Sequence, residues 1–441
     1  MFLGGCMTRK IWSNWSGGVT AHPKELFSPK DESELAQSMR TSAAPMRVTG
    51  AGHSFTPLCH SSGSLFSLEK MSGVVAVDRQ AASARVQAGT SIRDLGPLLH
   101  AEGLGLLNQG DIDRQAIAGA VGTGTHGTGK DLGSLSAGVL GFRLVTPSGE
   151  VLNCSRTENS DLFHAGRVSL GALGIMSEIN VQCRQSYVLE ERGGQLSTTD
   201  LFATIERLRD DNRHFEFFWF PFANDVLIKT LNEVEGNPKP RRRAPDNTDA
   251  PSDADFRRLC EISRFAPFLR SRFQRQMTAQ GGARYSGEAA GRSRWSHDAF
   301  PSDRNVRFNE MEYAIPAIMG PDCVQEVAAY MRMCGINFLF PIEYRYVAAD
   351  DIWLSPFFER DSVTISIHQY HKQSYKKLFR GVEEIFKSYG GRPHWGKIHT
   401  RTADDLAELY PNWQKFCAVR SSIDPGAKML NPYLKSLFGV D

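Results

Sequence analysis

The stretch Arg47–Thr56, RVTGAGHSFT, decides how the rest of the chain is interpreted. Its first residues complete a short apolar run, Met46–Val48, that is typical of a β-strand. Gly50 and Gly52 then permit a tight turn, because without a Cβ atom the backbone N–H groups can approach a ligand closely. His53 places a reactive imidazole directly after that turn. A glycine-rich turn after a strand is typical of a phosphate-binding loop, and the histidine indicates that further chemistry takes place beside it.

The spacing of this turn differs from the dinucleotide fingerprint Gly-x-Gly-x-x-Gly. Phe55 stands where the third glycine would fall, and no acidic residue follows at the expected distance. A second glycine-rich stretch, Ala116–Gly129 (AIAGAVGTGTHGTG), strengthens the interpretation of the first turn as a ligand-binding loop. Its Gly, Ala and Thr residues cannot fill a core with bulk, so they favour a backbone pressed flat against a large planar ligand and its phosphates. A glycine-rich hairpin without a ligand is the alternative.

Length and composition limit the class of protein. A chain of 441 residues is expected to form two or three domains, and 23% charged with 41% apolar residues is ordinary for a globular protein. The formal net charge of +2 argues against nucleic acid as the main partner, because phosphate binding needs a concentrated basic face. The one basic run, Lys239–Arg243, precedes a Pro/Asp/Ser-rich stretch that ends at Asp255. We interpret it as a solvated insertion loop, with a surface contact as the alternative.

The cysteines and the apolar runs bear on compartment and metal binding. The eight cysteines are scattered, with no Cys-x-x-Cys and no Cys/His pairing at zinc spacing, so reduced thiols in a cytoplasmic protein and no metal centre are expected. No run approaches the ~18 apolar residues of a membrane-spanning helix, so no span is expected, and any association with a membrane is expected to be peripheral. The start, Met1–Cys6, lacks the charged leader of a secretory signal, and either Met1 or Met7 can be the true start.

The order of periodic segments predicts an α+β fold. Ser362–Tyr370 alternates at period two and is expected to be a strand, as are 73–77, 84–89, 307–316 and 339–347. Helices are expected over 30–42, 91–100 and 375–389, with Ser91 capping the second of them. The chain has no internal repeats.

Charged residues two apart on expected strands point to one face of a sheet. Glu343 and Arg345 form such a pair, and Glu310 and Glu312 form another. A buried ion pair that serves stability is one interpretation of the first pair. The other is a polar pocket, in which Arg345 stabilises developing negative charge and Glu343 holds a hydroxyl group or orients the arginine. Glu310 and Glu312 can supply further acceptors.

Other candidate groups carry weaker signals. Lys397 stands in a Trp/Gly turn that offers little apolar support, so it is either a cation held toward an anionic group or a surface lysine. The histidines at 126, 368, 394 and 399 do not fall into any metal-ligand spacing. Neither Gly-x-Ser-x-Gly nor a Cys/His signature is present to support a hydrolase.

Five segments together resemble the aldonolactone oxidase group of the vanillyl-alcohol-oxidase (PCMH-type FAD-binding) superfamily. They are GAGHSFT (50–56), NQGDIDRQAIAGAVGTGTHGTG (108–129), HFEFFWFP (214–221), NEMEY (309–313) and RPHWGK (392–397). The group includes gulonolactone, galactonolactone and arabinonolactone oxidases, with the alditol oxidases close by. The resemblance covers nearly the whole chain, and it implies FAD as cofactor.

The resemblance implies that His53 is bonded to the 8α-methyl carbon of the flavin, so that FAD is covalently held. It also assigns cofactor contacts to positions along both glycine stretches and beyond them: Val48, Thr49, Gly50, Ala51, Gly52, His53, Ser54, Gly110, Asp111, Ala116, Gly119, Ala120, Val121, Gly122, Thr123, Ile175, Met176 and Lys397. Gly110 matches the gatekeeper beside flavin C4a–N5, where a small residue leaves room for O₂ and favours oxidase behaviour.

On the substrate side, the resemblance matches Glu343, Arg345 and Lys397 to the polar cluster of the family. It places Lys397 near flavin N1 and C2=O, where its charge stabilises the anionic reduced ring. Glu343, Glu310 and His368 are candidates for the general base, and Arg345 alone can also lower the proton affinity of the hydroxyl. Alditol oxidases carry Ser, Thr and Gln where this chain has Asp111, His368 and Glu310, which favours lactones over polyols.

The expected architecture has an FAD-binding domain over 1–186, a substrate (cap) domain over 187–397, and a segment over 398–441 that returns to the first domain. The expected reaction removes the C2 hydroxyl proton of a D-arabinono-, L-gulono- or L-galactono-1,4-lactone and passes hydride to flavin N5. The product is an ascorbate-type ene-diol lactone, and O₂ becomes H₂O₂. A polyol oxidase, a dehydrogenase with another acceptor and a catalytically silent flavin-binding protein stay open as alternatives. The oligomeric state stays open too.

Overall fold

The computed structural model describes residues 11–239, 251–287, 291–302 and 306–440. Met1, Met7 and the arginines of the basic run, 241–243, lie outside the described residues, and so do the expectations attached to them. The expected insertion loop ends earlier than its composition indicated, because residues 251–255 form the beginning of α6 (Pro251–Phe265). Proline is favoured at the first helical position, which explains why the helix starts there.

A small parallel sheet carries the glycine turn. Its strands are β3 (Glu25–Phe27), β5 (Ser64–Ser67) and β4 (Met46–Thr49), in the order β3-β5-β4. β4 runs directly into the turn, where Gly52 has a φ of +70°. The guanidinium group of Arg47 is buried and donates to four carbonyl oxygens, those of Leu58, Leu170, Gly171 and Met429. Because these carbonyls come from distant parts of the chain, Arg47 fixes the base of the turn.

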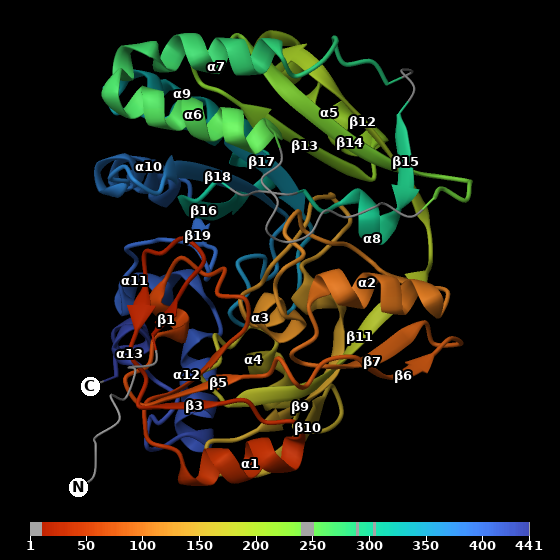
Figure 1. Cartoon of the computed structure of the whole chain (residues 1–441), viewed down its shortest axis with the longest axis vertical. Coiled ribbons are helices and arrows are strands. Elements are labelled where there is room, and N and C mark those ends of the chain that lie inside the picture. The colour runs from red at the N-terminus through yellow and green to blue at the C-terminus, as the bar shows by residue number, and fades with distance from the viewer. Residues whose placement is uncertain (1–10, 240–250, 288–290, 303–305, 441) are drawn as a thin grey trace, which may run out of the picture.

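A six-stranded antiparallel sheet lies beside it in the lower half of Figure 1. Its path is β10 (Val151–Ser155), β9 (Val139–Val145), β11 (Ile175–Gln185), β7 (Ser83–Gln87) and β6 (Val74–Asp78), with β8 (Leu104–Leu106) paired to β11. The helices of this half are α1 (Glu32–Thr41), α2 (Ile92–Ala101), α3 (Ile117–Gly122), α4 (Ser160–Gly166), α11 (Ala403–Leu409), α12 (Trp413–Ile423) and α13 (Pro432–Phe438). One apolar core joins both chain ends of this half, from Leu35 to Phe438.

The second half is built on an eight-stranded antiparallel sheet (upper half of Figure 1). Its order is β15 (Arg292–Trp295), β12 (Val188–Ser197), β14 (Asp225–Val234), β13 (His214–Trp219), β17 (Ile342–Val347), β18 (Ser362–Tyr370), β16 (Phe308–Pro316) and β19 (Arg392–Pro393). The helices of this half are α5 (Thr198–Asp211), α6, α7 (Arg270–Ala279), α8 (Ser296–Ala299), α9 (Gly320–Met333) and α10 (Lys376–Ser388). One face of the sheet packs against α5, α9 and α10 to form a second apolar core.

Short elements complete the description. They are the hairpin of β1 (Trp12–Ser13) with β2 (Thr20–Ala21), and the 3-10 turns η1 (Pro57–Cys59), η2 (Leu135–Gly138), η3 (Pro267–Leu269) and η4 (Ala317–Met319). Among the described residues, no helix combines the length and apolar character needed to cross a membrane. The cysteines within the described ranges are free thiols.

The expected α+β fold is confirmed, and so are the expected strands and helices of the sequence. Ser91 caps α2 by accepting a hydrogen bond from the backbone N–H of Asp94. The second glycine stretch departs from expectation, because residues 117–122 of the anticipated flat ribbon form the helix α3. Ala, Val and Ile tolerate a helix there, and the hydroxyl of Thr123 donates to the carbonyl of Gly119 at its end.

Candidate active site

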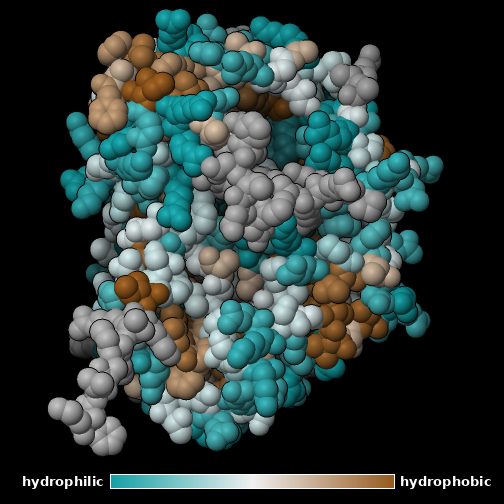
Figure 2. Space-filling view, in the orientation of Figure 1, coloured by the Kyte–Doolittle hydropathy of each residue, from teal (hydrophilic) through white to brown (hydrophobic). Residues whose placement is uncertain are grey.

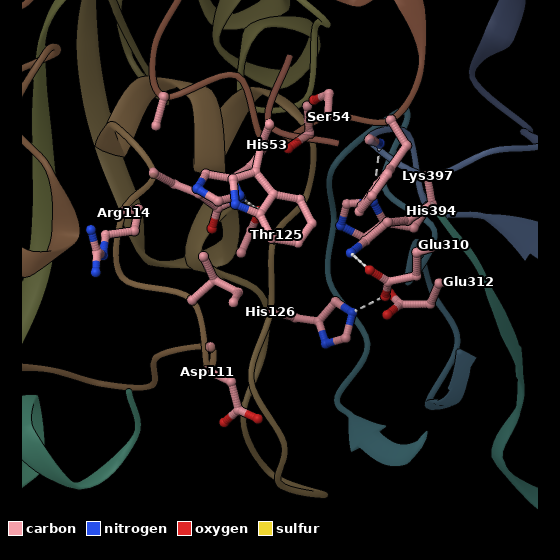
Figure 3. Close-up of a pocket in the computed structure, with 18 of the residues that line it drawn as sticks. His53, Ser54, Asp111, Arg114, Thr125, His126, Glu310, Glu312, His394 and Lys397 are labelled. Atoms are coloured by element: carbon pink, nitrogen blue, oxygen red, sulfur yellow. Dashed lines mark hydrogen bonds and ion pairs between the residues drawn. The ribbon is translucent and has the colours of Figure 1, made fainter. Parts of the chain in front are cut away.

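Two cavities meet at His53, which lines both of them. The first, of about 360 Å³, is the glycine-lined cavity and lies between β4, α3 and the start of β11. The second, of about 600 Å³, is the polar cavity and lies between His53 and the eight-stranded sheet. The residues that line both are Ala51, His53, Ser54, Arg114, Gln115 and Thr123. The two cavities therefore adjoin at these residues, and Figure 3 shows His53, Ser54 and Arg114 among the side chains that line the polar cavity.

Most residues matched to the cofactor by resemblance line the glycine-lined cavity. They are Val48, Thr49, Gly50, Ala51, Gly52, His53, Ser54, Ala116, Gly119, Gly122, Thr123, Ile175 and Met176. Gly110, Asp111 and Lys397 instead line the polar cavity. Ala120 and Val121 line neither, because helix α3 turns their side chains into the core, where both are fully buried. An extended ribbon would direct different side chains toward the glycine-lined cavity from those that the helix directs there.

Helix α3 keeps the glycine-lined cavity open. A Cβ atom added at Gly119 or Gly122 would meet no atom within 4 Å, so both positions border free space. The two glycine stretches are pressed together, because a Cβ atom at Gly50 would come within 3.0 Å of the Cβ of Ala116. Backbone therefore forms much of the wall, and space that side chains would occupy is left to a ligand. This arrangement fits a dinucleotide with a planar ring system.

His53 is held as a neutral imidazole. Burial lowers its pKa to about 4, and the nearby charges of Lys397 and Arg114 act in the same direction. The indole ring of Trp15 stacks on it, with the ring centroids 5.6 Å apart. A neutral ring retains a nitrogen lone pair at pH 7, which is the form required for a bond to carbon.

Strand register assembles the polar wall opposite His53. On β16 and β18, Glu310 is paired with His368 and Glu312 with Ser366, and on β17 Glu343 lies opposite the same Ser366. Successive side chains on a strand alternate between faces, so these groups share one face. Their neighbours, such as Met311, Tyr313 and Tyr344, point into the second apolar core on the other face.

A chain of charged groups runs through Glu312. Arg345 Nη2 lies 2.8 Å from Glu312 Oε2, which also accepts from the hydroxyl of Ser366 at 2.5 Å. His126 Nε2 lies 2.7 Å from Glu312 Oε1, and His126 Nδ1 lies 2.8 Å from the carbonyl oxygen of Gly127. Burial alone would raise the pKa of Glu312, but His126 and Arg345 hold it well below its usual range.

Lys397 is paired with Glu310, with Nζ 2.5 Å from Oε2. The ammonium also lies 5.1 Å from the centroid of the Phe55 ring. Burial raises the pKa of Glu310, but Lys397 and His368 outweigh it and lower that pKa below its usual range. The backbone of Ile398 donates to Glu310 and that of Phe55 donates to Gly396, so the turn that carries Lys397 is joined to both halves.

His368 lies behind this wall. Its Nε2 is 3.5 Å from Glu310 Oε1 and 3.9 Å from Glu343 Oε2. It lines a separate cavity of about 250 Å³, together with Glu343 and several aromatic rings. Of the five groups proposed for the substrate side, Glu343, Arg345, Glu310 and Lys397 therefore line the polar cavity, and His368 contacts it through the two carboxylates.

The far end of the polar cavity holds a second charged group. Lys229 Nζ lies 2.8 Å from Glu216 Oε1 and 3.4 Å from Asp111 Oδ1, so it connects the loop after Gly110 to the sheet. Burial, reinforced by the charge of Asp111, raises the pKa of Glu216 to about 7. Gly110 packs its backbone closely, since a Cβ atom there would lie 2.9 Å from the carbonyl oxygen of His126. Loop packing alone thus requires a small residue at this position.

Three potential metal ligands, on His126, Glu312 and His394, lie within 4.8 Å of one another. His394 Nδ1 accepts a hydrogen bond from the backbone N–H of Gly396 at 3.0 Å, so its proton sits on Nε2. Burial lowers the pKa of His394 to about 3, which keeps the ring neutral. A ring that offers an N–H, beside a carboxylate already paired with Arg345, suits a hydrogen-bond network better than a metal centre.

Residues outside the matched set also line the cavities, among them Trp15, Arg114, Thr125, His126 and His394. Arg114, Thr125 and His126 lie within the second quoted segment, and His394 lies within RPHWGK, so the motifs contained them without indicating their roles. Trp15 carries no such signal. Its place beside His53 follows from the hydrogen bond between the backbone N–H of Trp15 and the carbonyl of Gly52.

Comparisons with known proteins identify the family of this chain. A family model described as D-arabinono-1,4-lactone oxidase matches residues 179–437, and one described as FAD binding domain matches residues 23–155. The L-gulono-1,4-lactone dehydrogenase of Mycobacterium tuberculosis is 38% identical over 436 residues, which cover 97% of this chain and 99% of that protein. The L-gulonolactone oxidase of Bos taurus is 30% identical, with 97% and 98% covered.

The fold has solved relatives. A cholesterol oxidase from Brevibacterium sterolicum superposes with a TM-score of 0.79 at 17% identity, covering 97% of this chain and 96% of that one. Identity this low bears on the fold alone, and the superposition agrees with the expected α+β fold. The family matches confirm the resemblance drawn from the five segments, and they establish FAD as the cofactor of this chain.

Proposed function

Because this chain belongs to the D-arabinono-1,4-lactone oxidase family, we propose that it oxidises sugar-acid 1,4-lactones at the C2 carbinol. It is an FAD-dependent oxidoreductase acting on CH–OH donors, with aldonolactone oxidase or dehydrogenase activity. The substrates proposed are D-arabinono-, L-gulono- or L-galactono-1,4-lactone. The product is then a 2-keto lactone that tautomerises to an ascorbate-type ene-diol.

Two cations that line the polar cavity beside His53 carry this proposal. Arg345 stabilises the alkoxide that forms as the C2 hydroxyl loses its proton, because charge placed in advance needs no reorganisation. Lys397 supplies positive charge in the polar cavity near His53, where negative charge accumulates during reduction. Bound FAD would supply the hydride acceptor for C2 and would pass two electrons on to the final acceptor.

We propose Glu343 as the group that takes the hydroxyl proton, among the three candidates. Glu310 and Glu312 are poor bases, because their cationic partners lower the pKa of each carboxyl group. His368 does not line the polar cavity. Glu343 does, and its Oε1 lies 3.5 Å from Arg345 Nε, so one group can accept the proton while the other stabilises the alkoxide.

The cofactor is proposed to be covalently held through His53. The support is the lowered pKa of the imidazole, its position where the two cavities meet, and the stacking of Trp15, which fixes the ring plane. Gly119 and Gly122 leave space for the dinucleotide along α3. Ile175 and Met176, at the start of β11, close the far end of that cavity.

The electron acceptor is proposed to be O₂, with H₂O₂ as its product. A lactone dehydrogenase with another acceptor is the second candidate, because the M. tuberculosis relative carries that name. The tight packing of Gly110 against His126 weakens an argument for O₂ access from its size alone. An alditol oxidase is a third candidate, and Asp111, Glu310 and His368 favour lactones over it.

The acceptor is tested by reducing the purified holoprotein with a lactone under nitrogen and then admitting air. We expect flavin absorbance to return within the turnover time and H₂O₂ to form in equal amount to the lactone oxidised. Slow reoxidation in air, with fast reoxidation by an added dye, would assign the protein to the dehydrogenases. A turnover with xylitol or sorbitol that exceeds the turnover with every lactone would assign it to the alditol oxidases.

We also keep the three-part division 1–186, 187–397 and 398–441 and the cytoplasmic location as proposals. The end of β11 at Gln185 and the start of β12 at Val188, in a different sheet, support the first boundary. The packing of α11, α12 and α13 into the same core as β4 supports the returning segment. Free thiols in the described part of the chain support a reducing compartment.

A further inference from the structure

Three large apolar side chains are exposed side by side where α6 is followed by α7. Ile262, Phe265 and Phe268 are 47%, 82% and 76% exposed. α6 ends at Phe265, and η3 leads through Phe268 to the start of α7 at Arg270. Figure 2 shows the corresponding hydrophobic patch at the upper left of the molecule. We call these three residues the apolar tip.

The three side chains of the apolar tip are not part of the apolar core. On α6, Ile262 and Phe265 lie on one face, three residues apart, while Cys260 and Ser263 are buried. The inward side chains of the two helices, such as Phe273, already pack against a core cluster. Single exposed apolar residues are ordinary, but a contiguous group with two phenylalanines at a protruding turn marks an interaction surface.

Basic side chains flank the apolar tip. Arg272 and Arg275 are exposed on α7, and Arg258 is exposed on α6. Asp255 pairs with Arg258 at 3.2 Å and Glu261 pairs with Arg264 at 2.7 Å, so each of these two acidic groups of α6 is matched by an arginine of the same helix. Within the described ranges, no carboxylate lies within 4.0 Å of the guanidinium groups of Arg272 or Arg275. The surface around the tip is therefore positively charged.

We propose that the apolar tip docks the protein on an anionic membrane surface. Phe265 and Phe268 enter the boundary between headgroups and acyl chains, and Arg272 and Arg275 bind lipid phosphates. Aromatic rings suit this boundary, and each arginine near an anionic leaflet strengthens binding about fivefold.

The shape of the surface favours lipid over a protein partner. Three apolar side chains on a convex turn offer far less area than the roughly 800 Å² per partner of a stable protein interface. Peripheral membrane binding needs only a few inserted side chains together with basic charge. The turn also lies at the edge of the upper half, whereas α3, which lines the glycine-lined cavity, lies in the lower half (Figure 1).

The test measures co-sedimentation of the full-length holoprotein with sucrose-loaded vesicles. Vesicles of phosphatidylcholine with about 30 mol % phosphatidylglycerol are compared with phosphatidylcholine alone. We expect binding to the anionic vesicles only, with a loss on raising salt from about 0.1 M to about 0.5 M. The double variant F265S/F268S should lower the partition coefficient by at least about tenfold, and R272Q/R275Q should lower it by about tenfold or more.

Matched controls come from exposed apolar residues elsewhere on the same half. Ile318 is 91% and Met333 is 79% exposed, so I318S and M333S remove as much surface apolarity without touching the tip. They should bind vesicles as the parent protein does. Flavin absorbance and lactone turnover should be unchanged in all four variants, which shows that each is folded.

Two outcomes would overturn the proposal. Equal binding to neutral and anionic vesicles, or equal loss in the control variants, would mean unspecific adhesion. The parent protein could also fail to bind vesicles and form a dimer in sedimentation equilibrium that F265S/F268S converts to a monomer. In that case a second copy of the chain, not a membrane, would cover the apolar tip. Neither outcome bears on lactone oxidation, which is tested separately.

Discussion

At the scale of single residues, the account depends on cations that are positioned before substrate arrives. Arg345 is held by Glu312 at 2.8 Å, and Lys397 is held by Glu310 at 2.5 Å. Burial alone would lower the pKa of Arg345, but Glu343 and Glu312 raise it above its usual range, so the charge persists at every accessible pH. The paired carboxylates thus serve the cations rather than substrate directly.

Replacing either cation should slow reduction of the flavin. We expect Arg345→Met and Lys397→Met each to lower the anaerobic reduction rate by about 10²-fold or more, because each removes charge that acts in the transition state. Lys372→Met is the matched control, since Lys372 pairs with Glu261 on the surface. Stopped-flow absorbance measures the rates. Variants that reduce as fast as the control would remove these residues from the site.

A second prediction at this scale concerns the linkage to the cofactor. His53→Ala should abolish in-gel flavin fluorescence after acid denaturation, because no other residue is proposed to hold the ring covalently. Some dissociable FAD should remain, since the walls formed by α3 and β4 are unchanged. His60→Ala is the control, because His60 follows the same turn but does not line the cavity. A fluorescent band in the His53 variant would place the attachment elsewhere.

The sequence foretold some residues and not others for identifiable reasons. Glu343 and Arg345 could be placed on one face, and Glu310 and Glu312 on one face of another strand, because alternation along a strand fixes the facing side. The strand register that brings the two pairs to one wall could not be predicted. The pairing of His126 with Glu312 could not, because the residues are 186 positions apart and only the docking of the two halves joins them. His368, a candidate general base, lies beside Glu310 and Glu343 but lines a separate cavity together with aromatic side chains.

At the scale of elements, α3 is the part that the sequence represented least well. Six residues of small and branched side chains looked like a ribbon, since neither a capping side chain nor a charge pattern marks a helix there. The helix decides which side chains reach the cofactor. Gly119 and Gly122 border the cavity, whereas Ala120 and Val121 are buried in the core.

This geometry makes a prediction about α3. In the His53→Ala background, where FAD binds without a covalent bond, Gly119→Val should place a side chain in the glycine-lined cavity and raise the Kd for FAD at least about 100-fold, while the apoprotein keeps its unfolding midpoint. Gly138→Val is the control, since a Cβ atom at Gly138 also meets nothing within 4 Å but lies outside both cavities. Titration with FAD, followed by absorbance, measures the effect. Equal affinity in the two variants would mean that α3 does not face the cofactor.

At the scale of the whole molecule, buried histidines link stability to pH. Burial lowers the pKa of His214 and His394 to about 3 and of His399 to about 4, whereas an unfolded chain has a histidine pKa of about 6.5. The unfolded state therefore binds more protons below pH 6.5. The contribution of these histidines to the free energy of unfolding is complete above pH 6.5. It is lost as the pH falls toward the pKa values of the histidines in the folded protein.

We expect these histidines to lower the free energy of unfolding between pH 7 and pH 5, by up to about 1.4 kcal/mol per pH unit for each, while Glu216, whose pKa burial raises to about 7, contributes in the opposite direction. Urea unfolding followed by circular dichroism measures it. His214→Gln should reduce the slope, and His22→Gln, at an exposed position, should leave it unchanged. A slope that is flat over this range, or the same in both variants, would contradict the linkage.

The joining of the two halves is the feature that the sequence could indicate but not describe. Five motifs from both halves pointed to one family, and the fold class followed from them and from periodicity. The site itself forms only where β16, β17 and β18 face the turn after β4, and that meeting depends on contacts such as the hydrogen bond from Phe55 to Gly396. Contacts between segments so far apart in the chain leave no local pattern in the sequence.

The most direct test of the account is anaerobic mixing of the purified holoprotein with a panel of sugar-acid 1,4-lactones and, separately, with polyols, while flavin absorbance is followed. The account predicts that at least one lactone bleaches the flavin fully and that the reduction rate exceeds the rate with any polyol. A yellow protein that no lactone bleaches, or a preparation that neither contains flavin nor takes it up, would contradict it.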